Sequence, residues 1–145
     1  MPFRFPLAKV LLVKESVKKR EEQSLQKILL DMSRLAHQIE KLTAEIADSN
    51  NVVERALRQP VPAVEVQMLF STTQSNIESK KALVRELQTL EQSRERQADV
   101  YHAAHRNCEV LIDLLDKLKD EYEQEQVRVE QKQMDDIVIA RHLRS

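Results

Sequence analysis

Two histidines and a glutamate have a spacing that could hold a metal ion. His102 and His105 are three residues apart, and Glu109 follows one helical turn later, so a helix would place these side chains on one face. Imidazole and carboxylate groups are common ligands of Zn²⁺. Histidines beside the packing face of a helix are, however, far more often exposed surface residues than ligands. We therefore expect no metal ion and no cofactor in this chain.

Three further side chains could take part in catalysis. The adjacent Asp135 and Asp136 could act as paired acids, but a lone helix builds no pocket around them. Cys108 is the only cysteine, so the chain has neither a disulfide framework nor a thiolate metal site. At a helix-packing position it is expected to be a small buried hydrophobic residue. We therefore expect a protein that is not an enzyme.

The composition excludes several common classes of function. The 145 residues include no glycine, 3% aromatic residues and 32% charged residues. Without glycine the chain cannot build the loops that cradle phosphate groups or bind dinucleotides. The formal net charge of −1 gives no general attraction to nucleic acid. A single cysteine fits a reducing, cytoplasmic setting.

The start of the chain is not a membrane segment. Its longest apolar run is four residues, Val10 to Val13, and Lys9 and Lys14 enclose it. This run is too short for the apolar part of a signal peptide or for a bilayer span. We expect no direct insertion into a membrane.

The prolines divide the chain into two predicted helices. They stand only at positions 2, 6, 60 and 62, and proline is tolerated at the first turn of a helix but not inside it. We expect one helix over 7–57, a turn over 58–62 and a second helix over 63–143. The predicted fold is all-α, a single coiled-coil domain over residues 1–145. It forms a long two-helix antiparallel hairpin with an overhanging C-terminal helix.

Apolar residues in the first helix recur at alternating intervals of three and four, the spacing of a coiled-coil seam, that is, the row of side chains facing the other helix. The row is Leu25, Ile28, Met32, Leu35, Ile39, Leu42, Ile46, Ser49, Val53 and Ala56. Upstream, Leu7, Val10, Val13 and Val17 form another apolar stripe. The two stripes are out of phase, which predicts an eleven-residue offset that locally unwinds the supercoil.

The second helix continues the same spacing over a longer distance. Its predicted seam is Leu69, Thr73, Asn76, Lys80, Leu83, Leu87, Leu90, Arg94, Gln97, Tyr101, Ala104, Cys108, Leu111, Leu115, Leu118 and Tyr122. Five of these side chains, at positions 73, 76, 80, 94 and 97, are polar. Polar seam residues cost stability and fix register, so this stretch is expected to serve a purpose besides packing.

The charge distribution favours an antiparallel hairpin over a parallel dimer. Residues 1–20 carry six basic groups and one acid, whereas residues 109–136 carry ten acids and four bases. Folding back at 58–62 would bring these segments together and leave an overhang of about 30 residues, roughly 45 Å of helix. A parallel dimer would stack like charges instead. The overhang contains Met134, Ile137, Val138, Ile139 and Leu143, and exposed apolar groups of this kind indicate contact with another chain.

The two ends of the chain carry distinctive motifs. The start reads Phe3-Arg4-Phe5-Pro6-Leu7, followed by Val10-Leu11 and Lys14-Glu15. The end reads Arg128-Val129-Glu130-Gln131-Lys132-Gln133-Met134-Asp135-Asp136-Ile137, followed by Arg141. In these motifs, in its length and in its two-helix layout, the sequence resembles the flagellar FliJ family, soluble components of the bacterial flagellar type III export apparatus.

The resemblance implies a hairpin like the central stalk of rotary ATPases, with its paired ends in the pore of a hexameric export ATPase. The residues implied for ATPase binding are Phe3, Phe5, Leu7, Arg128, Gln131, Lys132, Asp135, Asp136, Ile137 and Arg141. The family's surface for the transmembrane export gate maps onto Leu69, Thr73 and Asn76, although Thr73 and Asn76 depart from the family pattern. Export chaperones are further implied partners, and the implied location is the cytoplasm, peripheral to the inner membrane at the flagellar base.

Two other functions are compatible with the same residues. A stalk subunit of a virulence type III secretion system would share the hairpin, although such subunits usually lack the Phe-Arg-Phe opening. A purely structural coiled-coil spacer would need no ATPase partner. Neighbouring genes would distinguish the first alternative from flagellar export, and co-purification with the export ATPase would distinguish the second.

Overall fold

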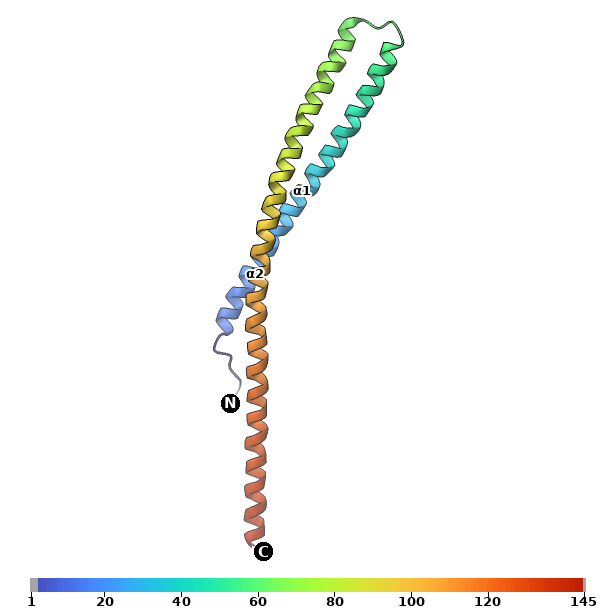
Figure 1. The fold of residues 1–145 in the computed structure, drawn as a ribbon. Coiled ribbons are helices and arrows are strands. Elements are labelled where there is room, and N and C mark those ends of the chain that lie inside the picture. Colours follow the sequence, from blue (N-terminus) through green and yellow to red (C-terminus); the bar gives the residue numbers. More distant parts are fainter. Residues whose placement is uncertain (1–2, 145) are drawn as a thin grey trace. The chain divides into compact units, whose positions relative to one another are not determined.

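A computed structural model describes residues 3–144, which form two long helices and no strand. Helix α1 spans Ala8–Leu57 and helix α2 spans Ala63–Arg144 (Figure 1). A short connection joins the two helices, and they pack against each other. The prediction of an all-α antiparallel helical hairpin is therefore confirmed.

A proline stands at or just before the start of each helix. Before α1, the carbonyl of Phe5 accepts a hydrogen bond from the Ala8 N–H at 3.1 Å, which closes a turn around Pro6. The carbonyl of Pro62 accepts the first bonds of α2, from the N–H groups of Glu65 at 3.1 Å and of Val66 at 3.4 Å. Since proline has no N–H to donate, a position at or just before a helix start costs it nothing.

The chain divides into two compact units. The hairpin unit comprises Glu21–Val100 and includes the connection between the helices. The terminal unit combines the chain up to Arg20 with α2 from Tyr101 onward. We describe each unit by itself.

In the hairpin unit, the two helices run side by side in opposite directions (Figure 1). Leu35 of α1 shares a surface depression with Leu83 and Leu90 of α2, and nearer the connection Ala56 does so with Leu69. Farthest from the connection, the Gln97 side-chain amide donates to the backbone carbonyl of Glu21 at 3.0 Å and to its carboxylate at 2.6 Å. Residue numbers therefore rise on one helix as they fall on the other, as the antiparallel prediction requires.

The predicted seams agree with the observed burial. Every seam position named for residues 25–56 and 69–122 is buried or half-buried. Leu35, Val53, Thr73, Ala104 and Cys108 are the most buried, and Cys108 is only 1% exposed. The three-and-four spacing therefore identified the facing side chains of both helices.

The upstream stripe was predicted wrongly at three of its four positions. Leu7, Val10 and Val13 are exposed, by 36%, 42% and 61%. Val17 is half-buried, as predicted, and the other half-buried positions of this segment are Leu11, Lys14, Lys18 and Glu21. Counted back from Leu25 in steps of four and three, positions 21, 18, 14 and 11 continue the heptad without an offset. The lysines can face the other helix because their methylene stems pack there while the ammonium groups reach water.

Candidate partner-binding surfaces

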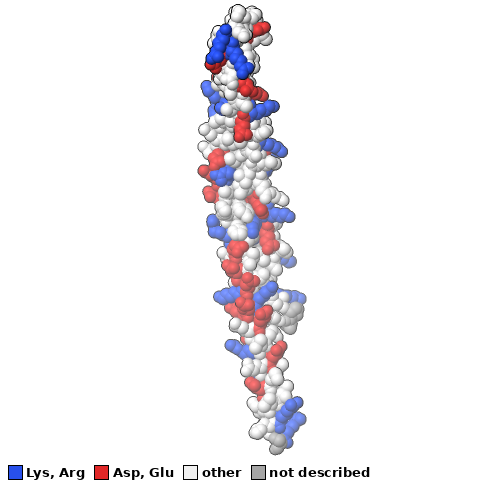
Figure 2. Space-filling model, turned by 90° about the vertical axis from the view of Figure 1, so that its right-hand side faces the viewer, with Lys and Arg blue, Asp and Glu red and all other residues white. Residues whose placement is uncertain are grey.

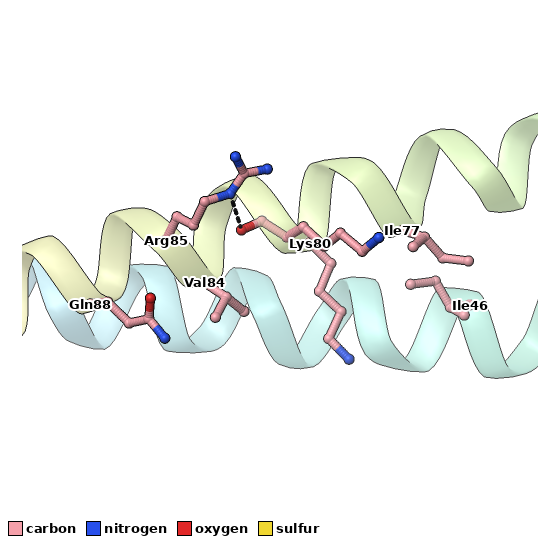
Figure 3. A pocket seen from close by; sticks show the side chains of 7 residues that line it. Ile46, Ile77, Lys80, Val84, Arg85 and Gln88 are labelled. Atoms are coloured by element: carbon pink, nitrogen blue, oxygen red, sulfur yellow. Dashed lines mark hydrogen bonds between the residues drawn. The ribbon is translucent and has the colours of Figure 1, made fainter.

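An apolar groove lies on the hairpin unit where Ile46 of α1 meets Ile77 and Val84 of α2 (Figure 3). Lys80, Lys81, Arg85 and Gln88 complete its lining. The Arg85 guanidinium donates to the backbone carbonyl of Lys81 at 3.3 Å, which holds that side chain along the helix. The groove thus combines an apolar floor with basic side chains at its rim. The seam pattern identified Ile46 and Lys80 as facing residues but did not predict the groove.

The residues implied for gate binding are seam residues of the hairpin unit. Thr73 is only 7% exposed, and its hydroxyl oxygen is buried without a hydrogen-bond partner. Leu69 is half-buried in a depression that it shares with Val52 and Val61. Asn76 is half-buried as well. A partner at this surface would therefore contact mainly the outer edges of these three side chains.

Two neighbouring side chains extend that surface into solvent. Met68 is 65% exposed and Phe70 is 56% exposed. Each is adjacent to Leu69 in sequence but lies off the seam. The sequence pattern gave no reason to select Met68, because exposed apolar residues outside the seam carry no periodic signal.

The N-terminal residues implied for ATPase binding lie against α2 in the terminal unit. The Phe3 ring contacts the Tyr122 ring with 5.4 Å between centroids and an interplanar angle of 53°. Phe5 is half-buried, and Leu7 is 36% exposed. Phe3 and Phe5 are therefore partly occupied by intramolecular packing, which leaves Leu7 as the more accessible side chain.

The C-terminal residues implied for ATPase binding lie on a bare helix. Every side chain from Glu123 to Arg144 is exposed, including Arg128, Gln131, Lys132, Asp135, Asp136, Ile137 and Arg141. Arg128 forms an ion pair with Glu125 of the same helix at 3.7 Å. Charged side chains of both signs follow this part of α2, with basic ones in its last turn (Figure 2). The structure thus brings these seven residues together along one helix.

The polar part of the seam includes an ion pair within α2. The Arg94 guanidinium hydrogen-bonds the Glu91 carboxylate one turn earlier on α2. This bond lowers the pKa of the Glu91 carboxyl from its ordinary value and raises the pKa of Arg94. Together with the Gln97–Glu21 bonds, it satisfies part of the polar seam that the sequence analysis singled out.

Comparison with known proteins identifies the family of the chain. The family described as flagellar FliJ protein matches residues 3–145, nearly the whole length. The chain belongs to the flagellar FliJ protein family. No curated protein and no solved structure matches the chain. Membership in this family confirms the resemblance seen in the terminal motifs and supports a component of the flagellar export apparatus.

Both histidine rings of this FliJ-family chain lie against the Tyr101 ring. The His105 and Tyr101 rings stack with 6.1 Å between centroids, and His105 Nε2 lies 3.9 Å from a carboxylate oxygen of Glu109. His105 Nδ1 is buried without a hydrogen-bond partner. Over residues 3–144, no group of three or more histidine, cysteine or acidic side chains is placed to hold a metal ion. In that same range, neither helix of the FliJ-family chain has an apolar stretch that could cross a bilayer.

Proposed function

We propose that this FliJ-family chain is a stalk-like, non-catalytic binding component of the flagellar type III export apparatus. In this proposal its paired ends bind the hexameric export ATPase, and the surface around Leu69, Thr73 and Asn76 binds the transmembrane export gate. The chain also escorts export chaperones. It works in the cytoplasm, peripheral to the inner membrane at the flagellar base.

The observation that carries ATPase binding is the bare helix from Glu123 to Arg144. None of its side chains is covered by the rest of the terminal unit, although several are large and apolar: Met134 is 67% exposed, Val138 62% and Leu143 81%. Exposed apolar groups grouped on one element favour contact with another chain. Phe3 contacts Tyr122, one residue before this bare helix begins, so both ends of the chain can enter one binding site.

The charges on this helix suit a pore formed by identical subunits. Arg128, Lys132 and Arg141 alternate with acidic side chains, so no single sign dominates the contact. A helix inside a ring meets each subunit with a different side, and exposed ion pairs contribute only about 0–1 kcal/mol each. Binding is therefore spread over many weak contacts, and one charge reversal should change it little.

The test compares ATPase stimulation by three forms of the full chain. Reversing Arg128, Lys132 and Arg141 together to Glu should weaken binding to the export ATPase, and more strongly at low salt because screening is weaker there. The matched control reverses Arg34, Arg58 and Lys81, three exposed bases of the hairpin unit. It makes the same change in net charge and should leave stimulation intact. Equal loss in both variants would point to net charge alone and contradict docking of the ends.

A deletion tests the same proposal without changing charge on the remaining surface. Removing residues 128–145 should abolish stimulation of the ATPase and leave the hairpin helical by circular dichroism. Full stimulation by the shortened chain would contradict the stalk proposal. Failure to co-purify with the ATPase in any form would favour the structural spacer.

Gate binding is tested at the edge of the seam. Phe70→Asp changes an exposed side chain and should weaken capture of the export gate without loss of helicity. Leu69→Asp should weaken capture as well, but Leu69 is half-buried, so its unfolding curve must be measured alongside. Thermal melting separates loss of the surface from loss of the fold. Normal capture of the gate by both variants would exclude this surface as the gate-binding site.

A further inference from the structure

A second row of residues follows α2 on the side away from the N-terminal segment. Its members are spaced by three and four residues, as in a coiled-coil seam. They are Asp120, Glu123, Val127, Glu130, Met134, Ile137, Arg141 and Arg144. At 3.6 residues per turn, Tyr122 lies about 200° around the helix from Asp120. Another helix can therefore lie along this row without displacing Phe3 from Tyr122.

All members of the row, from Asp120 to Arg144, are exposed. Val127 is 61% exposed, Met134 67% and Ile137 53%. At its start, Asp120, Glu123, Gln124 and Val127 line a shallow depression on the helix surface. Positions i, i+3, i+4 and i+7 are those that form the hole for a side chain of a facing helix in knobs-into-holes packing. The row therefore has both the spacing and the surface relief of an unfilled seam.

The charges along the row identify what fits it. Its first two members are acidic, its last two are basic, and three apolar side chains and Glu130 stand between them. A row with acid at one end and base at the other is complementary to itself when reversed. We infer that residues 120–144 pair with the same segment of a second copy of this chain, antiparallel and centred on Lys132.

This register joins opposite charges at both ends of the seam and apolar side chains further in. Each facing pair has residue numbers that add to 264, and two-fold symmetry repeats each pair. The pairs are Asp120 with Arg144, Glu123 with Arg141, Val127 with Ile137, and Glu130 with Met134. The outer two layers join opposite charges, and the next layer joins Val127 to Ile137. The innermost layer places the charged Glu130 beside Met134, which costs stability and helps to fix register. The positions flanking the seam are uncharged, so nothing there opposes the pairing: Gln124, Gln126, Gln131, Gln133, Val138 and Ala140.

A parallel pairing is disfavoured by the same residues. In register, it would place Asp120 against Asp120, Glu123 against Glu123 and Arg141 against Arg141. Like charges at facing seam positions select against a pairing. The antiparallel dimer buries the same surface on both copies, as two-fold symmetric interfaces do. With few apolar layers and exposed ion pairs at both ends, it should be weak and salt-sensitive.

Charge-swap variants of the full chain test the pairing by sedimentation. The unchanged chain should show a concentration-dependent monomer–dimer equilibrium that high salt weakens. Arg141→Glu with Arg144→Glu sets acids against acids, and Asp120→Arg with Glu123→Arg sets bases against bases. Each double variant alone should raise the dimer Kd at least tenfold. An equimolar mixture of the two double variants should dimerise again, because every outer layer then joins opposite charges.

The outcomes separate cleanly. A chain that stays monomeric at the highest concentration it tolerates would overturn the pairing, as would a mixture no more dimeric than its components. All four changed residues lie outside the seam with the N-terminal segment, so helicity should be unchanged. The chain that carries all four changes should dimerise like the unchanged one. ATPase stimulation by that chain is a separate readout, so failure of this pairing leaves the proposed function intact.

Cysteine cross-linking tests the register. In the antiparallel pair, Gln131 and Gln133 flank the two-fold axis, so Gln131→Cys and Gln133→Cys should each form a disulfide with its own counterpart. Lys132→Cys points away from the seam and should not. Val127→Cys should cross-link to itself only in a parallel pair. The native Cys108 is 1% exposed, so the unchanged chain is the background control. Equal cross-linking at positions 131 and 132, or strong cross-linking at 127, would overturn the register.

Discussion

The rings of Phe3 and Tyr122 lie 5.4 Å apart, centroid to centroid, and are tilted by 53°. Tyr122 is the last half-buried residue of α2 in the part of the chain that the structure describes. The contact therefore marks the point at which the N-terminal segment stops covering α2. Beyond this point every described side chain of α2 is exposed and can contact a partner.

Replacing Tyr122 should loosen the N-terminal segment. A tilted aromatic pair contributes about 0.5–1.5 kcal/mol beyond the area that it buries. Tyr122→Leu keeps an apolar side chain but removes the ring contact, so it should lower the free energy of unfolding by about 1 kcal/mol. Urea unfolding followed by circular dichroism measures the change. Phe70→Leu, which alters an exposed ring, is the control and should have little effect.

Thr73 gives a prediction that separates stability from binding. Its hydroxyl is buried without a hydrogen bond, and leaving such a group unsatisfied costs about 1–3 kcal/mol. Thr73→Val removes the hydroxyl at nearly constant shape and should raise the free energy of unfolding by about 1 kcal/mol. If the hydroxyl serves the export gate, the same variant should capture the gate less well. Ser71→Val, at an exposed position, should do neither.

The register of the N-terminal segment can be tested with opposite substitutions. Lys14 is half-buried on the seam, whereas Val13 is 61% exposed. Lys14→Leu should raise the free energy of unfolding by about 1 kcal/mol, because partial burial of a leucine gains part of its transfer free energy. Val13→Lys should change it by less than about 0.5 kcal/mol, as surface substitutions usually do. If Val13→Lys instead lowers the free energy of unfolding strongly and Lys14→Leu does not raise it, the apolar stripe is the packing face.

The Glu91–Arg94 contact predicts a change in titration. The hydrogen bond from Arg94 holds the pKa of the Glu91 carboxyl below its ordinary value. Arg94→Met should therefore raise that pKa towards the ordinary value, as measured by NMR titration of the Glu91 side chain. Because the folded pKa is the lower one, the contact stabilises the fold above the unfolded pKa. The stabilisation is lost as the pH falls through the folded pKa, so it is fully present at neutral pH and its pH dependence is confined to acidic solution.

Periodicity predicted most of the fold because it reports on packing directly. From Leu25 to Tyr122, the side chains spaced by three and four are the ones that face another helix. Prolines 60 and 62 located the connection, since neither can lie inside a helix. The pattern failed only before Glu21, where the seam runs through Leu11, Lys14 and Lys18 and three of the four predicted apolar residues face water. There the continuity of the heptad outweighs hydrophobicity, which a search for apolar spacing cannot detect.

The candidate surfaces were predictable only in part. The exposed apolar side chains near Met134 and Ile137 followed from the length difference between the helices. The burial of Thr73 followed from its seam position, but the lack of a partner for its hydroxyl depends on which atoms α1 presents to it. The groove beside Ile46 could not be predicted either, because its depth depends on side chains from both helices. A sequence gives the order of residues along each helix but not the gaps between two of them.

The burial of Cys108 makes its thiol, the only one in the chain, a reporter of how often the N-terminal segment detaches from α2. On a bare helix every side chain is exposed, as from Glu123 onward, yet Cys108 is 1% exposed. Within the terminal unit, the covering must come from the N-terminal segment. Alkylation of this thiol therefore requires that segment to lift, and its rate reports how often this happens. One native sulfur atom can thus record, without any label added to the protein, whether a bound partner holds residues 3–20 against α2 or releases them.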